Sequence, residues 1–540
     1  MKPIRLIIAL ALIAGLVLAI EPVPEARAAT ELIVDASTGT IDFGDACPSP
    51  TDSATYKSLQ AAINCAVSGD TITVHDGTYG VTGQTGCNGY NAAIVIQDLD
   101  DLTIQAAPGH EPKIQPVTAV EANIVSISII NSDRLTIDNI DSDQTIAQWD
   151  NWHVCDSEDL TVQNSTFEGG EDGIDFETSH TTALIEGNTF INISTGSGDE
   201  VLDFTDGSFS DVIIQDNVFQ NNYRQITVYP PSGHTASGFI IRRNVMDGTN
   251  SQEAVRFISA SDMTLENNVI MHSTQQGLYI DSGCTNINVW HNSFFYNGEE
   301  EIRTKVSGTD VVIQNNIIYA NGTSAAISAN TPSLPGEDFN LIYNYGTATE
   351  SSQGPVTTFG PDTTFGDPLF VSTAAGAEDL HLQSASPAIE TGTDLGVSDD
   401  IEQGSRPNPA GTLPDRGAYE FFEEPTAVTL VSFAAQDGPG SVTLIWETAA
   451  EIDNAGFNLY RATAPDGSYV KVNTALISAQ GDPTSGARYT FLDKGLATGT
   501  YAYKLEDVDL GGVATMHGPV PATVMPRFRR PAYRPTWPGF

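Results

Sequence analysis

The sequence predicts an all-β protein in which a long coil of short parallel strands precedes a small β-sandwich. Two observations predict this fold. The first is a repeat of about two dozen residues, in which short β-type runs surround a recurring asparagine. The second is a change after Thr426 to longer runs, such as "VTLIWET" and "YAYKLEDVD", that alternate apolar and polar residues.

The chain begins with a pattern typical of export. Lys2 and Arg5 precede the apolar run "LIIALALIAGLVLAI", and "EARAA" follows with small residues at Ala26 and Ala28. This pattern predicts a signal peptide over residues 1–28, cleaved after Ala28. The apolar run is too short for a typical membrane span. We therefore expect a secreted protein, extracellular or at the cell surface, whose mature chain does not insert into a membrane.

The charge balance excludes some classes of partner. With 69 Asp and Glu against 23 Lys and Arg, the formal net charge is −46. Such a chain repels nucleic acid and anionic membranes, whereas it attracts cations. We expect no nucleic-acid partner, no organic cofactor and a monomeric chain.

Five cysteines suit an oxidising compartment. Cys47, Cys65 and Cys87 cluster near the mature N-terminus, where one disulfide could join two of them, and the sequence leaves their pairing open. Cys155 and Cys284 follow at longer spacing. Because the count is odd, at least one thiol stays unpaired, and we expect it to be buried. The spacings are not those of a zinc site.

The repeat is visible in eight similar segments, "LTVQNSTF", "ALIEGNTF", "VIIQDNVF", "FIIRRNVM", "MTLENNVI", "INVWHNSF", "VVIQNNII" and "EDFNLIYN". Their asparagines are Asn164, Asn188, Asn217, Asn244, Asn268, Asn292, Asn316 and Asn340, at steps of 24, 29, 27, 24, 24, 24 and 24 residues. Stacked turns of parallel strands would place these side chains in one column. We predict a structural amide ladder rather than a catalytic one.

A family resemblance supports the same fold. The segment "SLQAAINCAVSGDTITVHDGTY" resembles the start of secreted proteins of the pectin-lyase-like superfamily, in which a short helix caps the coils. The resemblance covers about residues 56–345. It implies a right-handed single-stranded parallel β-helix over residues 29–364, including the N-terminal cap. It implies no single activity, because the superfamily holds lyases, hydrolases, epimerases, tailspikes and adhesins.

Three further segments complete the expected organisation. Residues 365–424, with "FGDPLF" and "PDRGAYEF", resemble the closing segment that often follows such coils. Residues 425–524 resemble a fibronectin type III module, with Trp446 on an early strand. Residues 525–540, "MPRFRRPAYRPTWPGF", form a basic, proline-rich tail. For this tail we expect disorder, with attachment to the cell surface as the alternative.

The apolar pairs of successive repeats set a register for side chains that face solvent. The residues between those pairs form one outward column, Asp175, Asp203, Thr227, Arg256, Tyr279 and Arg303. Two positions earlier lies a second column, Asp172, Glu200, Arg224, Glu253, Gln276 and Glu300. Glu171 is expected to lie over Asp199.

Three carboxylate pairs in adjacent turns should therefore repel one another. A Ca²⁺ ion held by Glu171, Asp175 and Asp203 would remove the repulsion. Alternatively, one acid stays protonated and can serve as a general acid. A third interpretation is an acidic surface whose side chains spread into water.

The acids also resemble a catalytic pattern. "EDGIDF" and "DEVLDF" fall where polygalacturonase-type glycoside hydrolases carry Asn-Thr-Asp-Gly and Asp-Asp turns. The resemblance implies Glu200 or Asp199 as the general acid, with Asp172 helping to hold the attacking water. Arg224 stands where that family has histidine, and Ile258 where it has lysine.

Two cations and several aromatics complete the candidate site. Arg224 and Arg256 could hold a sugar carboxylate, and either could act as the base in β-elimination by a lyase. Tyr223, Tyr229 and Tyr279 could stack on sugar rings, with Arg303 beside them. Seven histidines are interpreted as turn or surface residues: His75, His110, His153, His180, His234, His272 and His291.

The sequence therefore predicts a carbohydrate-active or carbohydrate-binding protein that acts on extracellular, uronate-containing polysaccharide by hydrolysis or β-elimination. The alternative is a non-catalytic adhesion or scaffold protein.

Overall fold

The computed structural model describes residues 30–48, 55–117, 124–146, 149–178, 180–193, 200–306, 308–348, 353–422, 428–452, 454–482, 485–510 and 514–525. The chain divides into two compact units, residues 1–421 and 422–540. The expected signal peptide and nearly all of the basic tail lie outside the described residues. Within the described residues, no helix has the length and apolar character that a membrane span requires.

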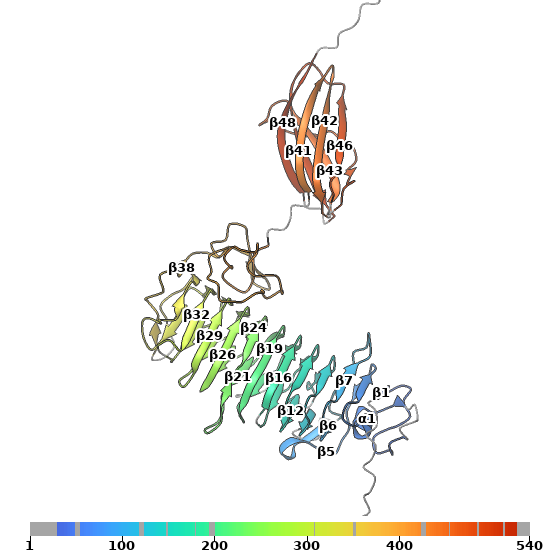
Figure 1. Cartoon of the computed structure of the whole chain (residues 1–540), viewed down its shortest axis with the longest axis vertical. Helices are drawn as coiled ribbons and strands as arrows, with labels where there is room; N and C mark the ends of the chain where they lie inside the picture. Colours follow the sequence, from blue (N-terminus) through green and yellow to red (C-terminus); the bar gives the residue numbers. More distant parts are fainter. Residues whose placement is uncertain are drawn as a thin grey trace, which may run out of the picture. The chain divides into compact units, whose positions relative to one another are not determined.

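The first unit is a coil of three long sheets, whose turns lie one on another along the solenoid (Figure 1). Sheet A contains β1 (Glu31–Val34), β2 (Thr55–Tyr56), β3 (Thr71–Val74), β7 (Thr103–Ala106), β10 (Thr136–Asp138), β13 (Leu160–Gln163), β16 (His180–Glu186), β19 (Phe209–Gln215), β22 (Ala236–Ser237), β23 (Ile240–Arg242), β26 (Ala260–Glu266), β29 (Thr285–Trp290), β32 (Val311–Gln314) and β35 (Glu337–Asp338). Sheet B contains β4 (Thr78–Tyr79), β8 (Lys113–Ile114), β11 (Asp141–Asp143), β14 (Thr166–Glu168), β17 (Thr189–Ile191), β20 (Val218–Asn222), β24 (Val245–Thr249), β27 (Val269–Met271), β30 (Ser293–Phe295), β33 (Ile317–Tyr319), β36 (Leu341–Tyr343) and β38 (Thr364–Phe365).

Sheet C carries the predicted acidic columns. It contains β5 (Gln84–Thr85), β6 (Asn91–Gln97), β9 (Ile124–Ile130), β12 (Trp152–Cys155), β15 (Ile174–Phe176), β18 (Leu202–Phe204), β21 (Ile226–Val228), β25 (Val255–Phe257), β28 (Leu278–Ile280), β31 (Ile302–Thr304), β34 (Ile327–Ala329) and β37 (Gly354–Pro355). From β6 to β34 every pairing in this sheet is parallel. The predicted all-β coil of parallel strands is confirmed.

The interior of the coil is apolar because alternate residues of each short strand point inward. Like side chains stack from turn to turn. The rings of Phe167, Phe190 and Phe219 lie 4.7 and 5.0 Å apart between successive centroids, and those of Phe176 and Phe204 lie 4.5 Å apart. These stacks fix the register, because a slip by one residue would turn every apolar side chain outward.

The asparagine ladder forms, and it begins one turn later than predicted. From Asn188 to Asn316, each backbone N–H donates to the side-chain oxygen of the ladder residue in the next turn, at 2.9–3.0 Å. Asn164 is exposed, and Ser165 takes the ladder position of that turn. The expected first member was therefore wrong by one residue, because the asparagine of "LTVQNSTF" lies in an αL turn (φ 55°) that faces solvent.

A short helix and two disulfides secure the start of the coil. The helix α1 (Leu59–Cys65) is almost entirely buried, as the predicted cap requires. Cys47 pairs with Cys65 within the predicted cluster, and Cys87 pairs with Cys155, a bond that the sequence did not indicate. Cys284 is free and buried, in agreement with the prediction for the odd thiol.

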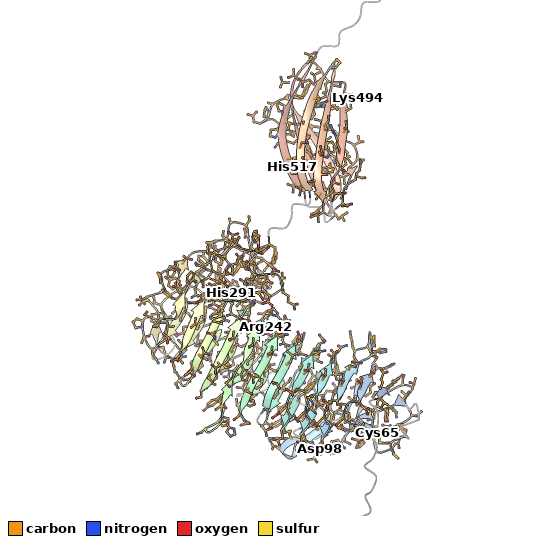
Figure 2. All side chains as sticks on the ribbon, in the orientation of Figure 1. Cys65, Asp98, Arg242, His291, Lys494 and His517 are labelled. Atoms are coloured by element: carbon orange, nitrogen blue, oxygen red, sulfur yellow. A yellow bond between two sulfur atoms is a disulfide. The ribbon has the colours of Figure 1, made fainter. Side chains whose placement is uncertain are left out.

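The closing segment packs on the outside of sheet B. The hairpin β39 (Phe370–Ala374) and β40 (Ala377–Leu382) contributes Phe370 and Leu380 to an apolar cluster with Phe295 and Ile317. Buried arginine and histidine side chains hold the irregular remainder. Arg406 donates to the carbonyl oxygen of Asp415 at 2.8 Å and to His291 Nδ1 at 2.9 Å. His291 is labelled in Figure 2.

The second unit is made of antiparallel strands. One sheet contains β41 (Val428–Gly438), β42 (Ser441–Glu451) and β46 (Arg488–Lys494). The other contains β43 (Asn454–Ala462), β44 (Val470–Lys471), β45 (Ile477–Ser478), β47 (Gly499–Asp509) and β48 (Ala514–Val524). Both sheets bury residues in one apolar cluster, where the rings of Trp446 and Tyr489 stack at 5.0 Å and pack against Phe457. This arrangement suits the predicted small sandwich.

Candidate active site on sheet C

The outward column of sheet C has the predicted register. Asp175 pairs with Asp203, Asp203 with Thr227, and Thr227 with Arg256. Tyr279 and Arg303 follow in the next two strands. The structure adds His153, which pairs with Asp175 from the preceding strand. The sequence prediction assigns this histidine to no site. The apolar pairs that define the outward column begin one turn later and do not include Trp152 and Val154, which bracket it.

The second column lies at the turn before each strand, as predicted. It begins with Asp150 and continues through Asp172 and Glu200. The backbone N–H of Asp172 donates to Asp150 Oδ1 at 3.0 Å, and the backbone N–H of Glu200 donates to Asp172 Oδ1 at 2.5 Å. The carboxylates of Asp150 and Asp172 therefore each accept a hydrogen bond from the next coil of the β-helix. These bonds fix both carboxylates beside the outward column.

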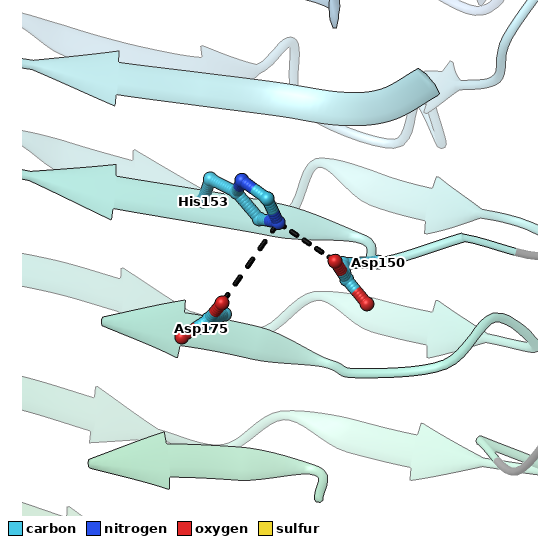
Figure 3. Close-up of side chains that lie close together, drawn as sticks. All are labelled: Asp150, His153 and Asp175. Carbon is cyan, nitrogen blue, oxygen red and sulfur yellow. Dashed lines mark hydrogen bonds and ion pairs between the residues drawn. The ribbon is translucent and has the colours of Figure 1, made fainter. Parts of the chain in front are cut away.

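His153 joins the two columns (Figure 3). The imidazole is buried, with 1% of its surface exposed, and its Nε2 donates to Asp150 Oδ2 at 2.7 Å. The same Nε2 lies 3.9 Å from Asp175 Oδ2, and Nδ1 lies 3.3 Å from Glu177 Oε1. The ring is thus held by Asp150 through Nε2, while Glu177 lies near Nδ1 without a hydrogen bond to it. We call Asp150, His153, Asp172, Asp175 and Asp203 the acid cluster.

Burial and mutual repulsion change the acidity of this cluster. Burial, followed by the charge of Asp203, raises the pKa of Asp175 to about 10. Burial, followed by the charge of Glu200, raises the pKa of Asp203 to about 8. Burial and the charges of Asp150 and Asp203 place the pKa of Asp172 well above its usual range. Asp175 and Asp203 are partly exposed, so protonated carboxyl groups are accessible at neutral pH.

Glu200 is in a different situation from its neighbours. Its side chain is buried and accepts a hydrogen bond from Arg224. Arg224 also lies 3.3 Å from Glu253 Oε1 through its Nε, and Arg256 lies 3.6 Å from the same oxygen. Burial raises the pKa of Glu200, although Arg224 acts in the opposite direction. These four side chains form a buried ion network beside the acid cluster.

Cations surround Tyr279 further along the column. The guanidinium carbons of Arg256 and Arg303 lie 5.9 and 5.1 Å from the ring centroid, and Lys305 Nζ lies 5.2 Å away. The phenol donates to Asp281 Oδ2 at 2.6 Å. Tyr279 itself is mostly buried, which leaves little ring surface for a sugar.

The remaining predicted residues are more scattered. Tyr229 is exposed beyond the end of β21, and Tyr223 accepts a hydrogen bond from Gln252 at 3.0 Å. Glu171 lies in the turn before β15, where its N–H donates to the carbonyl oxygen of Trp149 at 3.1 Å. Asp199, the other member of its expected pair, lies outside the described residues.

One group of side chains could hold a metal ion. Among the described residues, the ligand atoms of Asp150, His153 and Asp175 lie within 4.8 Å of one another. An imidazole nitrogen among carboxylates suits a transition metal such as Zn²⁺ or Mn²⁺ better than Ca²⁺, which prefers oxygen ligands only. This set shares only Asp175 with the group predicted to bind Ca²⁺.

Comparison with known families identifies the coil. Residues 146–300 and, overlapping them, residues 204–358 match the family model described as "Right handed beta helix region". The coil is a right-handed β-helix. The matched residues include the strands β12 to β25 and the turns before them, which carry the acid cluster and the ion network.

Solved structures are similar to this β-helix chain at low sequence identity. Pectate lyase Pel9A is 12% identical, with 73% of this chain and 98% of that chain covered and a TM-score of 0.37. The A-module of mannuronan C-5 epimerase AlgE6 from Azotobacter vinelandii is 12% identical, with 56% and 81% covered and a TM-score of 0.33. A mutant tailspike protein of E. coli bacteriophage HK620, in complex with a pentasaccharide, is 13% identical, with 81% and 88% covered and a TM-score of 0.32. No curated protein matches the sequence.

Proposed function

We propose that this β-helix protein is a secreted carbohydrate-active enzyme, which binds an extracellular polysaccharide along sheet C and cleaves it at the acid cluster. The observation that carries the proposal is the row His153, Asp175 and Asp203 on three consecutive strands. It places a buried, carboxylate-held imidazole beside two accessible carboxyl groups whose pKa values are raised to about 10 and about 8. Perturbed acids gathered on a rigid surface are typical of acid–base catalysis.

Cleavage of a glycosidic bond requires a proton for the leaving oxygen. We assign that role to Asp203, because its pKa of about 8 is nearer to neutrality than that of Asp175, about 10, and its carboxyl group is partly exposed. Glu200, which the resemblance to polygalacturonases implied as the acid, is less suited, because its carboxylate is buried against Arg224. His153 and Asp175 stand on the side of Asp203 opposite to this ion network.

The second reacting group distinguishes two reactions. In hydrolysis, a carboxylate activates water, whereas in β-elimination a base removes the proton at carbon 5 of a uronate. His153 is buried and lies two strands from Asp203, so it holds Asp150 and Asp175 in place rather than acting as the base. We favour elimination, because Arg256 is the cation of the outward column that can receive a uronate carboxylate. Its side chain is 30% exposed, and its strand lies two places from that of Asp203. Two strand spacings are about 10 Å, which is comparable to the length of two sugar units. One polysaccharide chain could therefore reach both Asp203 and Arg256.

A bound divalent cation stays part of the proposal. Ca²⁺ at Glu171, Asp175 and Asp203 would bind a uronate carboxylate and lower the repulsion between the acids. A cation at Asp150, His153 and Asp175 would have the same electrostatic effect, but it would compete with the proton on His153 Nε2.

The experiment is a cleavage assay of the chain from Ala29 onward with uronans and neutral glycans, in Ca²⁺ and in EDTA. Reducing ends and unsaturated products are followed together. Unsaturated product, lost in Asp203→Asn and His153→Ala and retained in His272→Ala, is the expected result. His272 is a matched control because it is paired with Asp247 at 2.8 Å outside the candidate site.

Other outcomes lead to different conclusions. Reducing ends without unsaturation would make the enzyme a hydrolase. Absence of both products on every glycan, with a folded protein, would contradict the proposal and leave the adhesion or scaffold function.

A further inference from the structure

A loop from an early turn of the β-helix reaches the acid cluster. It lies between β5 and β6 and contains the 3₁₀ turn η1 (Cys87–Gly89), followed by Tyr90. The ring of Tyr90 lies edge-on to His153, with 5.0 Å between the centroids and 88° between the planes. Asn88 Nδ2 donates to Glu177 Oε2 at 2.6 Å, although the two residues are 89 positions apart. The loop therefore contacts the imidazole and one of its carboxylates.

Trp149 is a second aromatic neighbour of Tyr90. Its centroid is 6.0 Å from that of Tyr90, and the planes are inclined by 40°. Both aromatic side chains are only partly buried. Two partly exposed aromatic rings, next to groups that can exchange protons, form a surface for the C–H face of a sugar.

The loop is fixed in place by covalent and polar contacts. The Cys87–Cys155 disulfide joins it to the end of β12, the strand that carries His153. The backbone N–H of Cys87 donates to Ser128 Oγ at 2.7 Å, and Ser128 precedes His153 in the outward column. Gly86 is needed for this close approach, because a Cβ there would lie 2.5 Å from Ser128 Cβ.

We propose that Tyr90 and Trp149 form the binding platform for one pyranose ring of the polysaccharide, and that the Cys87–Cys155 disulfide holds this platform against the acid cluster. The inference rests on the proposed function for the identity of the ligand. The bound ring would stack on the aromatic surface, while its hydroxyl groups face Asn88 and Glu177. The platform would fix the position of the sugar next to the bond that Asp203 protonates.

The disulfide makes the platform dependent on oxidation. Without it, the turn at Cys87 keeps only hydrogen bonds to sheet C. Loss of the disulfide removes the covalent link between the turn at Cys87 and β12, so the unliganded loop gains conformational freedom. Binding would then have to restore the order of Tyr90, which weakens affinity.

The test measures binding by calorimetry, with hexasaccharides of galacturonate, mannuronate and glucose as the probes. All variants carry Asp203→Asn, so that the probes are not cleaved. Tyr90→Ala and Trp149→Ala are each expected to raise Kd about tenfold. Tyr90→Phe keeps the ring and should bind within about threefold of the parent protein. Tyr229→Ala, at an exposed tyrosine outside the platform, should have no effect.

The disulfide has its own matched pair of variants. Cys87→Ser with Cys155→Ser should weaken binding as much as Tyr90→Ala, whereas Cys47→Ser with Cys65→Ser should leave Kd unchanged. Circular dichroism confirms that each variant retains the β-helix. Equal Kd values for the parent, Tyr90→Ala and the Cys87/Cys155 variant would overturn the inference, as would equal weakening by both cysteine pairs.

Binding and cleavage measurements test the platform and the proposed reaction independently. Binding that depends on Tyr90, by a protein that cleaves no glycan, supports the platform and contradicts the enzyme. Cleavage by a protein whose Kd ignores Tyr90 and Trp149 supports the enzyme and overturns the platform. Failure of the parent protein to bind any of the three probes also overturns the platform.

Discussion

Asp175 and Asp203 occupy the same position in two consecutive strands of sheet C, one directly above the other. Two carboxylates at this spacing cannot both ionise without strong repulsion, and partial burial increases the cost. The structure places His153 before them and the Glu200–Arg224 ion network after them. Asp175 and Asp203 therefore retain protons on a surface that a long polysaccharide can reach.

Asp203→Asn should lower kcat on the polysaccharide that the panel identifies by about 10²–10⁴, because the amide cannot donate a proton to the leaving oxygen. KM should change much less, since the side chain keeps its size. Asp247→Asn, on sheet B, is the matched control and should keep kcat. Steady-state kinetics measure both constants. A kcat for Asp203→Asn within a few fold of the parent would remove Asp203 from the mechanism.

Glu200→Gln and Asp175→Asn should change stability in opposite directions. The first leaves Arg224 buried with one carboxylate partner fewer, and breaking a buried ion pair costs about 3–5 kcal/mol. The second removes one of two repelling acids. At pH 9 the unfolded chain ionises Asp175, whereas the folded state still holds it protonated beside the ionised Asp203, which costs the folded state stability. Thermal unfolding at this pH should therefore show a lower midpoint for Glu200→Gln and a higher one for Asp175→Asn. Equal shifts of the same sign would contradict this account of the site.

Glu301 provides a separate test of pH dependence. Its carboxyl group is fully buried, and burial raises its pKa to about 8. A raised pKa means that the folded state binds the proton more tightly, so this contribution to stability is complete below about pH 4.5 and is lost as the pH rises to about 8. The midpoint of thermal unfolding should therefore fall less between pH 5 and pH 9 in Glu301→Gln than in the parent. Asp310→Asn, at an exposed acid, should leave the fall unchanged.

Much of this architecture was predictable, because the strand register of a stacked repeat can be predicted from the sequence. The apolar pairs around Asp175, Asp203 and Arg256 gave the outward column correctly, since each repeat must bury the same positions. Asn164 was misplaced by one residue, because it stands three positions before Phe167, whereas Asn188 stands two positions before Phe190. Ser165 is at the equivalent position, and its backbone N–H donates to Asn188 Oδ1.

The candidate site was less predictable than the fold. His153 could have been found by extending the apolar pairs one turn earlier, to Trp152 and Val154. Tyr90 could not, because it reaches His153 through a loop whose position depends on the Cys87–Cys155 bond. No periodicity encodes that contact. The buried state of Glu200 was also hidden, since sequence alone does not show that Arg224 turns back onto the preceding turn.

A divalent cation should raise the midpoint of thermal unfolding if the acids bind it. The expected result is a rise with Ca²⁺ or Zn²⁺, reversed by EDTA, because a ligand that binds only the folded state stabilises it. Asp175→Asn should remove the rise, since both candidate ion sites use this residue. His153→Ala should remove the rise with Zn²⁺ alone, which would distinguish the two sets of ligands. An unchanged midpoint with either metal would leave protons as the means by which the acids are neutralised.

The amide ladder gives the sharpest prediction for the fold. In Asn268→Ala, the backbone N–H and the side-chain amide of Asn244 both lose the oxygen to which they donate at 2.9 and 3.0 Å. The amide still donates to the carbonyl oxygens of Ile214 and Arg242, but the backbone N–H is left without an acceptor. A buried group left unsatisfied costs about 1–3 kcal/mol, so the midpoint of unfolding should fall by several degrees. Asn164→Gly is the control, because this asparagine is exposed in an αL turn that glycine also adopts, and the change should be nearly neutral. Equal losses from the two variants would show that the interior ladder does not contribute to the stability of the β-helix.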